Sequence, residues 1–233
     1  MVTPRRREVT PPPCAPIREV SLTPGATAWT LAPVAANACA PVASIAQGST
    51  AQETLRVRLS TRSAVLLTGD STLQLFTEQG AATPIRTALG ACGAGVYSGV
   101  AVLDPGVYVL RAPGTAPGAR RVNVEAVPVA GYASVERAGS SSAYLSTGGA
   151  SSGGVCSHGD GADVRVLACP GAAATIRSNN GATVALESAS GGRVCFSAPA
   201  GVPVQATSPA GRLVVVRAFA MGPSRGPVSV SFR

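Results

Sequence analysis

The 233-residue sequence has no lysine and few aromatic residues. Phe, Trp and Tyr together make up 4% of the positions, so the core must be built from Val, Leu, Ile and Ala, which favours a thin sandwich over a deep pocket. All 19 basic residues are arginine, and the formal net charge is +8 at pH 7. Because Ala, Gly, Pro and Arg are all abundant, coding bias in a GC-rich genome explains this composition better than a polyanion-binding face does.

The pattern typical of nucleic-acid recognition is also missing. The one arginine cluster is Arg5-Arg6-Arg7, in the Pro-rich stretch 1–13, and the other arginines lie along predicted strands without aromatic neighbours that could stack on bases. We therefore expect no specific nucleic-acid partner. Binding of a polyanion through the Arg-rich tail stays open as an alternative.

Metal chemistry has little support either. The chain has one histidine, His158, and no Cys-x-x-Cys pair, so an ordinary zinc site cannot be completed. Six cysteines, an even number, instead predict disulfides and an oxidising compartment. These cysteines are Cys14, Cys39, Cys92, Cys156, Cys169 and Cys195.

Long hydrophobic runs are absent, which excludes a membrane-spanning helix. Apolar spacing of three and four residues does not persist over ten positions, so we expect almost no helix. What the chain does contain is short alternating segments between Gly/Pro turns, the pattern of an all-β protein.

The central segment is Leu103-Asp104-Pro105-Gly106-Val107-Tyr108, a turn in which Gly106 is expected to take a conformation that a side chain would resist. A second copy of this pattern is Pro199-Ala200-Gly201-Val202-Pro203-Val204. This repetition predicts two tandem jelly-roll-like β-sandwich modules, at 14–128 and 129–233, after a mobile basic Pro-rich tail at 1–13.

Within each module we expect hairpins between neighbouring strands. One joins Val20–Leu22 to Ala28–Leu31, and another joins Ala64–Leu67 to Leu73–Phe76. In the second module, Val164-Arg165-Val166 corresponds to Leu55-Arg56-Val57. In an eight-stranded jelly roll the third and sixth strands are neighbours, which predicts a Cys169–Cys195 disulfide. The same reasoning pairs Cys39 with Cys92 and leaves Cys14 and Cys156 unassigned.

Two further groups of residues carry a possible binding role. Asp160 and Asp163 could offer oxygen ligands to Ca²⁺, but a solvated Gly-rich turn is the better interpretation, and we expect no metal and no cofactor. Trp29 and Tyr144 occupy corresponding positions and could stack on sugar rings, although a half-buried core role is favoured. No constellation of catalytic residues is present, so we expect a protein that is not an enzyme.

The motifs Asp70-Ser71-Thr72-Leu73-Gln74-Leu75 and Leu103-Asp104-Pro105-Gly106-Val107-Tyr108 resemble those of the bacterial pre-peptidase C-terminal domain. Leu22-Thr23-Pro24-Gly25 is similar to that family's opening turn. The resemblance implies a β-sandwich in a secreted bacterial protein, concerned with secretion, solubility or binding to matrix or polysaccharide. The second copy is divergent, with Gly181 and Pro203 where the family has Asp and Tyr.

The sequence therefore predicts a non-catalytic, secreted binding or structural module, extracellular or on the cell surface. Its expected partners are an extracellular protein, a polysaccharide or further copies of itself in an oligomer or fibre. The alternatives are accessory domains of a secreted hydrolase whose catalytic part lies elsewhere, or a polyanion binder.

Overall fold

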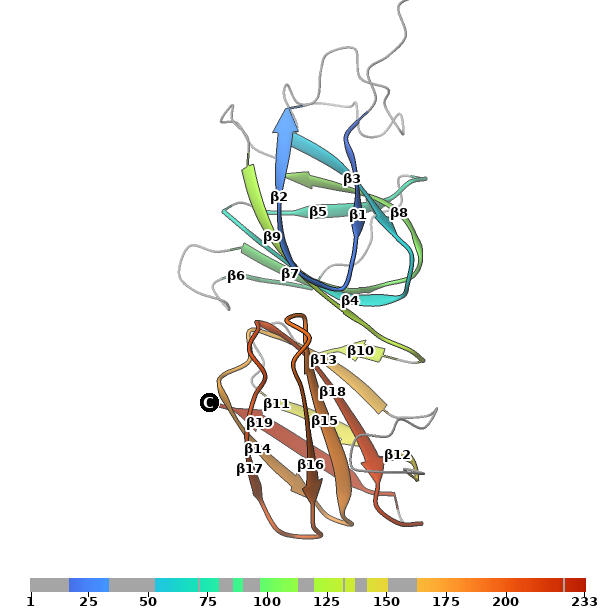
Figure 1. Ribbon diagram of the computed structural model, residues 1–233, viewed down its shortest axis with the longest axis vertical. Helices are drawn as coiled ribbons and strands as arrows, with labels where there is room; N and C mark the ends of the chain where they lie inside the picture. The colour runs from blue at the N-terminus through green and yellow to red at the C-terminus, as the bar shows by residue number, and fades with distance from the viewer. Residues whose placement is uncertain are drawn as a thin grey trace, which may run out of the picture.

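The computed structural model describes residues 17–33, 53–70, 72–79, 86–89, 97–112, 120–131, 133–136, 142–150, 163–223 and 225–233. These residues form an all-β structure without a helix, as the sequence predicts (Figure 1). The first group of strands is β1 (Glu19–Leu22), β2 (Gly25–Pro33), β3 (Glu53–Leu59), β4 (Ser63–Gly69), β5 (Gln74–Thr77), β6 (Arg86–Leu89), β7 (Tyr97–Leu103), β8 (Gly106–Ala112) and β9 (Arg120–Pro128). The second group is β10 (Ala133–Val135), β11 (Ser142–Ser146), β12 (Gly148–Ala150), β13 (Asp163–Ala168), β14 (Ala173–Ser178), β15 (Ala182–Ser188), β16 (Arg193–Ala198), β17 (Val204–Thr207), β18 (Leu213–Ala220) and β19 (Pro227–Phe232).

Strands β1 to β9 form one sheet that folds over at β2, because the end of β2 pairs with β3 while its beginning pairs with β9. We call the half with β1, β3, β8 and β5 sheet I, and the half with β2, β9, β4, β7 and β6 sheet II. Strands β10, β13, β18, β15 and β16 form sheet III, with β12 also paired to β18, and β11, β19, β14 and β17 form sheet IV. Sheets I and II make the first β-sandwich, and sheets III and IV make the second.

The two sandwiches repeat one strand order. Sheet I runs β1-β3-β8-β5 and sheet III runs β10-β13-β18-β15, with the first pair parallel and the others antiparallel in both. Sheet II runs β2-β9-β4-β7 and sheet IV runs β11-β19-β14-β17, all antiparallel. Each strand of the first sandwich except β6 thus has a counterpart, nine strands later for β1 and β2 and ten strands later for the others. Val164-Arg165-Val166 does lie in β13, the counterpart of β3, but its valines belong to a third buried cluster that also includes residues of β4, whereas Leu55 and Val57 of β3 lie in the core of the first sandwich.

The expected hairpins are wrong. β1 pairs in parallel with β3 and not with β2, and β4 and β5 lie in different sheets. In each case the chain crosses from one sheet to the other. Such a crossing is possible because a short loop can span the distance between two packed sheets. Period-two alternation identifies a strand without identifying its partner.

Each sandwich has its own core between its two sheets. In the first, Leu31, Leu55, Val65, Leu110 and Val124 are nearly inaccessible to solvent and pack together. In the second, Leu145, Ile176, Leu186, Val216 and Val230 do the same. These aliphatic cores fit a sequence that is poor in aromatic residues, since two thin layers of Val and Leu fill the gap of about 10 Å between packed sheets.

The turn before β8 is held by a side chain and not by an unusual glycine. The hydroxyl of Tyr108 donates a hydrogen bond of 2.8 Å to the carbonyl oxygen of Asp104, and burial raises the pKa of Tyr108. Gly106 does not have a positive φ, and a Cβ there would meet its nearest atom, Cε2 of Tyr108, at 3.8 Å. The expectation for Gly106 is therefore wrong.

The second copy of this turn is the one that requires glycine. Gly201, in Pro199–Val204, has a φ of 73°. That segment joins β16 to β17, however, whereas strand order places the true counterpart of the β7–β8 turn between β17 and β18, at 208–212. Two unrelated Pro/Gly turns produced the similarity seen in the sequence.

Candidate functional site

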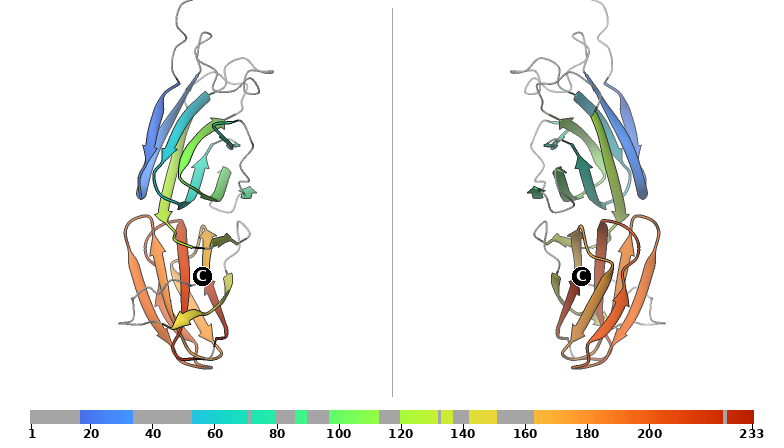
Figure 2. Two further views of the ribbon diagram at one scale, coloured as in Figure 1. Left: turned by 90° about the vertical axis from the view of Figure 1, so that its right-hand side faces the viewer. Right: turned by 90° about the vertical axis from the view of Figure 1, so that its left-hand side faces the viewer.

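The two sandwiches contact each other through apolar faces of sheets II and III. Ala64 and Leu66 of β4 and Val127 of β9 pack against Val166 of β13 and Val215 of β18 in a third buried cluster. Strands β4 and β18 are consequently buried on both faces. The sandwiches are stacked along the long axis of the molecule (Figures 1 and 2). We call this contact the joint.

One carboxylate makes hydrogen bonds across the edge of the joint. Glu125 alternates with Val124 and Ala126, which lie in the first core, so its side chain points outward from sheet II. Its Oε2 accepts hydrogen bonds from the backbone N–H groups of Arg212 and Leu213, both at 2.9 Å. Arg212 ends the β17–β18 turn of the other sandwich and Leu213 begins β18, so Glu125 fixes the position of this turn.

An arginine of the second sandwich donates a hydrogen bond to the first. Nη2 of Arg217 donates to the carbonyl oxygen of Pro128 at 3.1 Å and to Oε2 of Glu187 at 3.2 Å. Arg62 also donates to the carbonyl oxygen of Gly131, in the connection between the two sandwiches. Sequence reasoning missed all of these groups, because each partner lies tens of residues away and no local pattern signals it.

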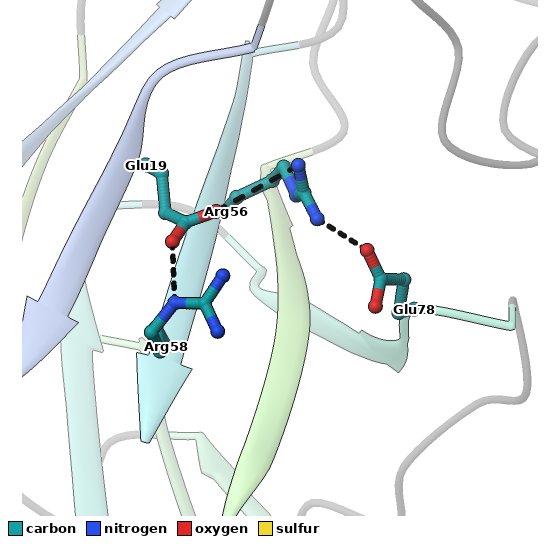
Figure 3. Close-up of polar contacts among 4 residues, drawn as sticks. All are labelled: Glu19, Arg56, Arg58 and Glu78. Carbon is teal, nitrogen blue, oxygen red and sulfur yellow. Dashed lines mark hydrogen bonds and ion pairs between the residues drawn. The ribbon is translucent and has the colours of Figure 1, made fainter. Parts of the chain in front are cut away.

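The outward face of sheet I carries a ladder of alternating charges (Figure 3). Glu19 of β1 lies 2.7 Å from Nε of Arg58 and 3.7 Å from Nη1 of Arg56, and Arg56 also contacts Glu78. The hydrogen bond from Arg58 lowers the pKa of the Glu19 carboxyl. This ladder neutralises its own arginines, so it offers little net charge to an anionic ligand.

A buried cation lies beside the ladder. Arg111 of β8 is 9% exposed and lies over the ring of Phe76, with 5.4 Å between the guanidinium carbon and the ring centroid. Burial lowers its pKa. A cation packed in this way contributes to the packing of the sheet and is not open to solvent.

Sheet III pairs its charges in the same manner, whereas sheet IV has almost none to pair. Arg165 contacts Asp163 and Glu136 at 3.1 Å each, and Glu187 contacts both Arg193 and Arg217. The four strands of sheet IV contain no Asp or Glu. The exposed Arg177 of β14 has no acidic neighbour within its own sheet.

The structure places Trp29 in the core, the role that the sequence favours over sugar stacking. Trp29 is 8% exposed and packs in the first core, so its ring is not available to a ligand. Tyr144 lies in β11, aligned with Ser229 of β19, as Trp29 of β2 is aligned with Val122 of β9. The two strands are equivalent but the two positions are not, because Trp29 is aligned with Val122 of the first core, whereas in β11 it is Leu145, the residue after Tyr144, that is aligned with a core residue, Val228. The side chain of Tyr144 is outside the described part of the structure.

Of the two residues that could offer oxygen ligands to Ca²⁺, the structure describes only Asp163. Asp163 is in β13 and pairs with Arg165. Asp160 lies outside the described residues, as do Cys14, Cys39, Cys92 and Cys156. Among the described residues, no group of three His, Cys, Asp or Glu side chains is close enough to hold a metal ion.

Cys169 and Cys195 are both disulfide-bonded, but the strand order contradicts a bond between them. Cys169 follows β13 and Cys195 is in β16, and β18 and β15 lie in between. Three strand spacings are about 14 Å, whereas the Cα atoms of a disulfide lie within about 7 Å. The error came from assuming that the third and sixth strands are neighbours.

Comparison with known proteins does not identify a family for this chain. No protein-family model and no curated protein matches the sequence. A solved structure of the CUB1-EGF-CUB2 domains of rat MASP-1 is similar over 92% of this chain and 100% of that chain, with 8% sequence identity and a TM-score of 0.26. A TM-score this low does not establish a shared fold. Within the described residues, no helix has the length and hydropathy needed to cross a membrane.

Proposed function

We propose that the chain is a non-catalytic, extracellular binding or structural unit in which two β-sandwiches are held at a fixed spacing. The joint is the observation that carries this proposal. It buries apolar residues from β4, β7 and β9 against residues from β13 and β18, and the two hydrogen bonds to Glu125 fix its orientation. A rigid two-module rod suits a spacer or a binding scaffold, since domains joined by a flexible linker alone do not keep a defined distance.

The chemistry of the described cysteines supports an extracellular location. Disulfides at Cys169 and Cys195 are stable in oxidising compartments and rare in a reducing cytosol. The resemblance of Leu103-Asp104-Pro105-Gly106-Val107-Tyr108 to the pre-peptidase C-terminal domain agrees with secretion. On this proposal the turn motif serves the fold, because the phenol of Tyr108 bonds back to Asp104.

Small-angle X-ray scattering of the whole chain tests the rigid spacing. The wild-type profile should fit one elongated particle, and Leu66→Asp should make it fit two independently moving bodies, because a carboxylate would be buried in the joint. Arg58→Asp, a charge change outside the joint, is the control and should leave the profile unchanged. A wild-type profile of two freely moving bodies contradicts the proposal.

A second measurement addresses the absence of catalysis. The purified chain should not turn over generic ester or peptide substrates above the background of a heat-denatured sample. Turnover that resists further purification would favour a hydrolase and overturn the non-catalytic assignment.

A further inference from the structure

We infer that the outward face of sheet IV binds an acidic polysaccharide, with the guanidinium of Arg177 contacting a carboxylate of the sugar chain. This inference deepens the proposed function and rests on it. The face is defined by Thr175 and Arg177 of β14, Ser229 and Ser231 of β19, and Gln205 of β17. Their neighbours in sequence, including Ile176, Val230 and Ala206, are buried in the second core.

Strand register places these side chains in two straight rows. Ser231, Thr175 and Gln205 are aligned across β19, β14 and β17, and Ser229 is aligned with Arg177 in the next row. Thr175 donates a hydrogen bond of 3.1 Å to Oε1 of Gln205. The hydroxyls and the amide thus present donors and acceptors in a plane, which suits a ligand with many hydroxyl groups of its own.

Charge distinguishes this face from the strands of sheet III. Arg177 is exposed, and no carboxylate of the described residues forms an ion pair with it. On the strands of sheet III, Arg165, Arg193 and Arg217 all have acidic partners. An unpaired guanidinium in a field of hydroxyls favours a carboxylate, because a charged acceptor makes the stronger hydrogen bond.

The other described side chains of this face are uncharged and polar: Thr175, Gln205, Ser229 and Ser231. A polysaccharide offers hydroxyls to these donors and acceptors along its length, and an acidic polysaccharide adds a carboxylate for the guanidinium.

Binding of polygalacturonate to the whole chain tests the inference, with neutral dextran and double-stranded DNA as comparison ligands. The wild type should bind polygalacturonate, weaken with added salt and ignore dextran. Arg177→Gln should lower the affinity about fivefold to tenfold, and Arg177→Lys should recover part of it. Arg121→Gln, which removes the same charge from an exposed position on β9, is the matched control and should change the affinity less than about twofold.

Three outcomes would overturn the inference: no binding by the wild type, equal losses in Arg177→Gln and Arg121→Gln, or tighter binding of DNA than of polygalacturonate. Circular dichroism of each variant shows whether the fold is kept. Gln205→Ala changes a second exposed position of the same face and should also weaken binding. The rigid spacing is tested separately by scattering. A chain that scatters as one rigid particle but does not bind polygalacturonate would refute this inference and leave the proposed function standing.

Discussion

The carboxylate of Glu125 in the first sandwich accepts the backbone N–H of Leu213 in the second at 2.9 Å, across a separation of 88 residues. The same oxygen accepts the N–H of Arg212. Two charge-assisted hydrogen bonds to one loop fix that loop in both position and direction. The joint is therefore specified by polar geometry as well as by apolar burial.

Replacement of this carboxylate should loosen the joint. Glu125→Ala removes both hydrogen bonds and should lower the free energy of unfolding by about 1–2 kcal/mol, since the site is only partly buried. Urea denaturation measures the change. Asp70→Ala, at an exposed acidic residue, is the control and should cost less than about 0.5 kcal/mol. Equal effects of the two substitutions would show that the contact with Arg212 and Leu213 contributes nothing.

Tyr108 should ionise at a higher pH than an unperturbed tyrosine. Burial raises its pKa, so the folded state holds the phenol proton more tightly than the unfolded state does. The resulting stabilisation is complete below about pH 10 and is lost as the pH rises through the raised pKa. Ultraviolet titration of tyrosinate should show a late component that disappears in Tyr108→Phe and persists in Tyr144→Phe. Tyr108→Phe should also lower the free energy of unfolding by about 1 kcal/mol, because it removes the hydrogen bond to the carbonyl oxygen of Asp104.

The two Pro/Gly turns should respond differently to alanine. Gly201 has a φ of 73°, where an L side chain is strained, so Gly201→Ala should destabilise the protein by about 1 kcal/mol. Gly106 is not in that region, and its Cβ would make ordinary contacts, so Gly106→Ala should be neutral or slightly stabilising. Thermal melts of the two variants decide the matter, and the reverse order would contradict the assigned backbone conformations.

Peptide mapping under non-reducing conditions should find Cys169 and Cys195 in two separate disulfides. The strand order β13-β18-β15-β16 keeps the two residues apart, so a single peptide pair containing both would be incompatible with sheet III as described. Mapping after reduction and alkylation provides the control for exchange during digestion.

The charge ladder of sheet I should give Glu19 a low pKa. The hydrogen bond from Arg58 stabilises the carboxylate, so its contribution to stability is present above the unfolded-state pKa and is lost as the pH falls through the lowered folded-state pKa. Carboxyl NMR of the wild type and of Arg58→Gln measures this, and the substitution should raise the pKa of Glu19 toward its ordinary value. An unchanged pKa would mean that the contact in Figure 3 is not populated in solution.

Sequence patterns identified most strands but few of their partners. Alternation at Leu55-Arg56-Val57 and Val164-Arg165-Val166 correctly predicts β3 and β13, because successive side chains of a strand point to opposite faces. It does not tell which buried layer the apolar face meets, since Val164 and Val166 pack in the joint and not in the second core. Partner choice depends on residues far apart in the chain, as with β1 and β3, and a short motif does not encode it. The joint could not be predicted from the sequence either, because the apolar outer positions of β4 and β18 have the same pattern as those of any strand that is buried on both faces. Tyr108 is the opposite case, because its turn motif is local and its partner lies four residues away.

The polar outer faces of sheets I and IV limit how the chain can assemble. Sheets II and III pack their apolar outer faces on each other, whereas the outer face of sheet I carries Arg58 and Glu19 and that of sheet IV carries Arg177. A further copy packed face to face on sheet I or sheet IV would therefore cover charged groups with little apolar area to bury. Among the described strands, β17 is at the edge of sheet IV, so a fibre built from this chain would grow through strand edges of this kind and not through the faces of its sheets.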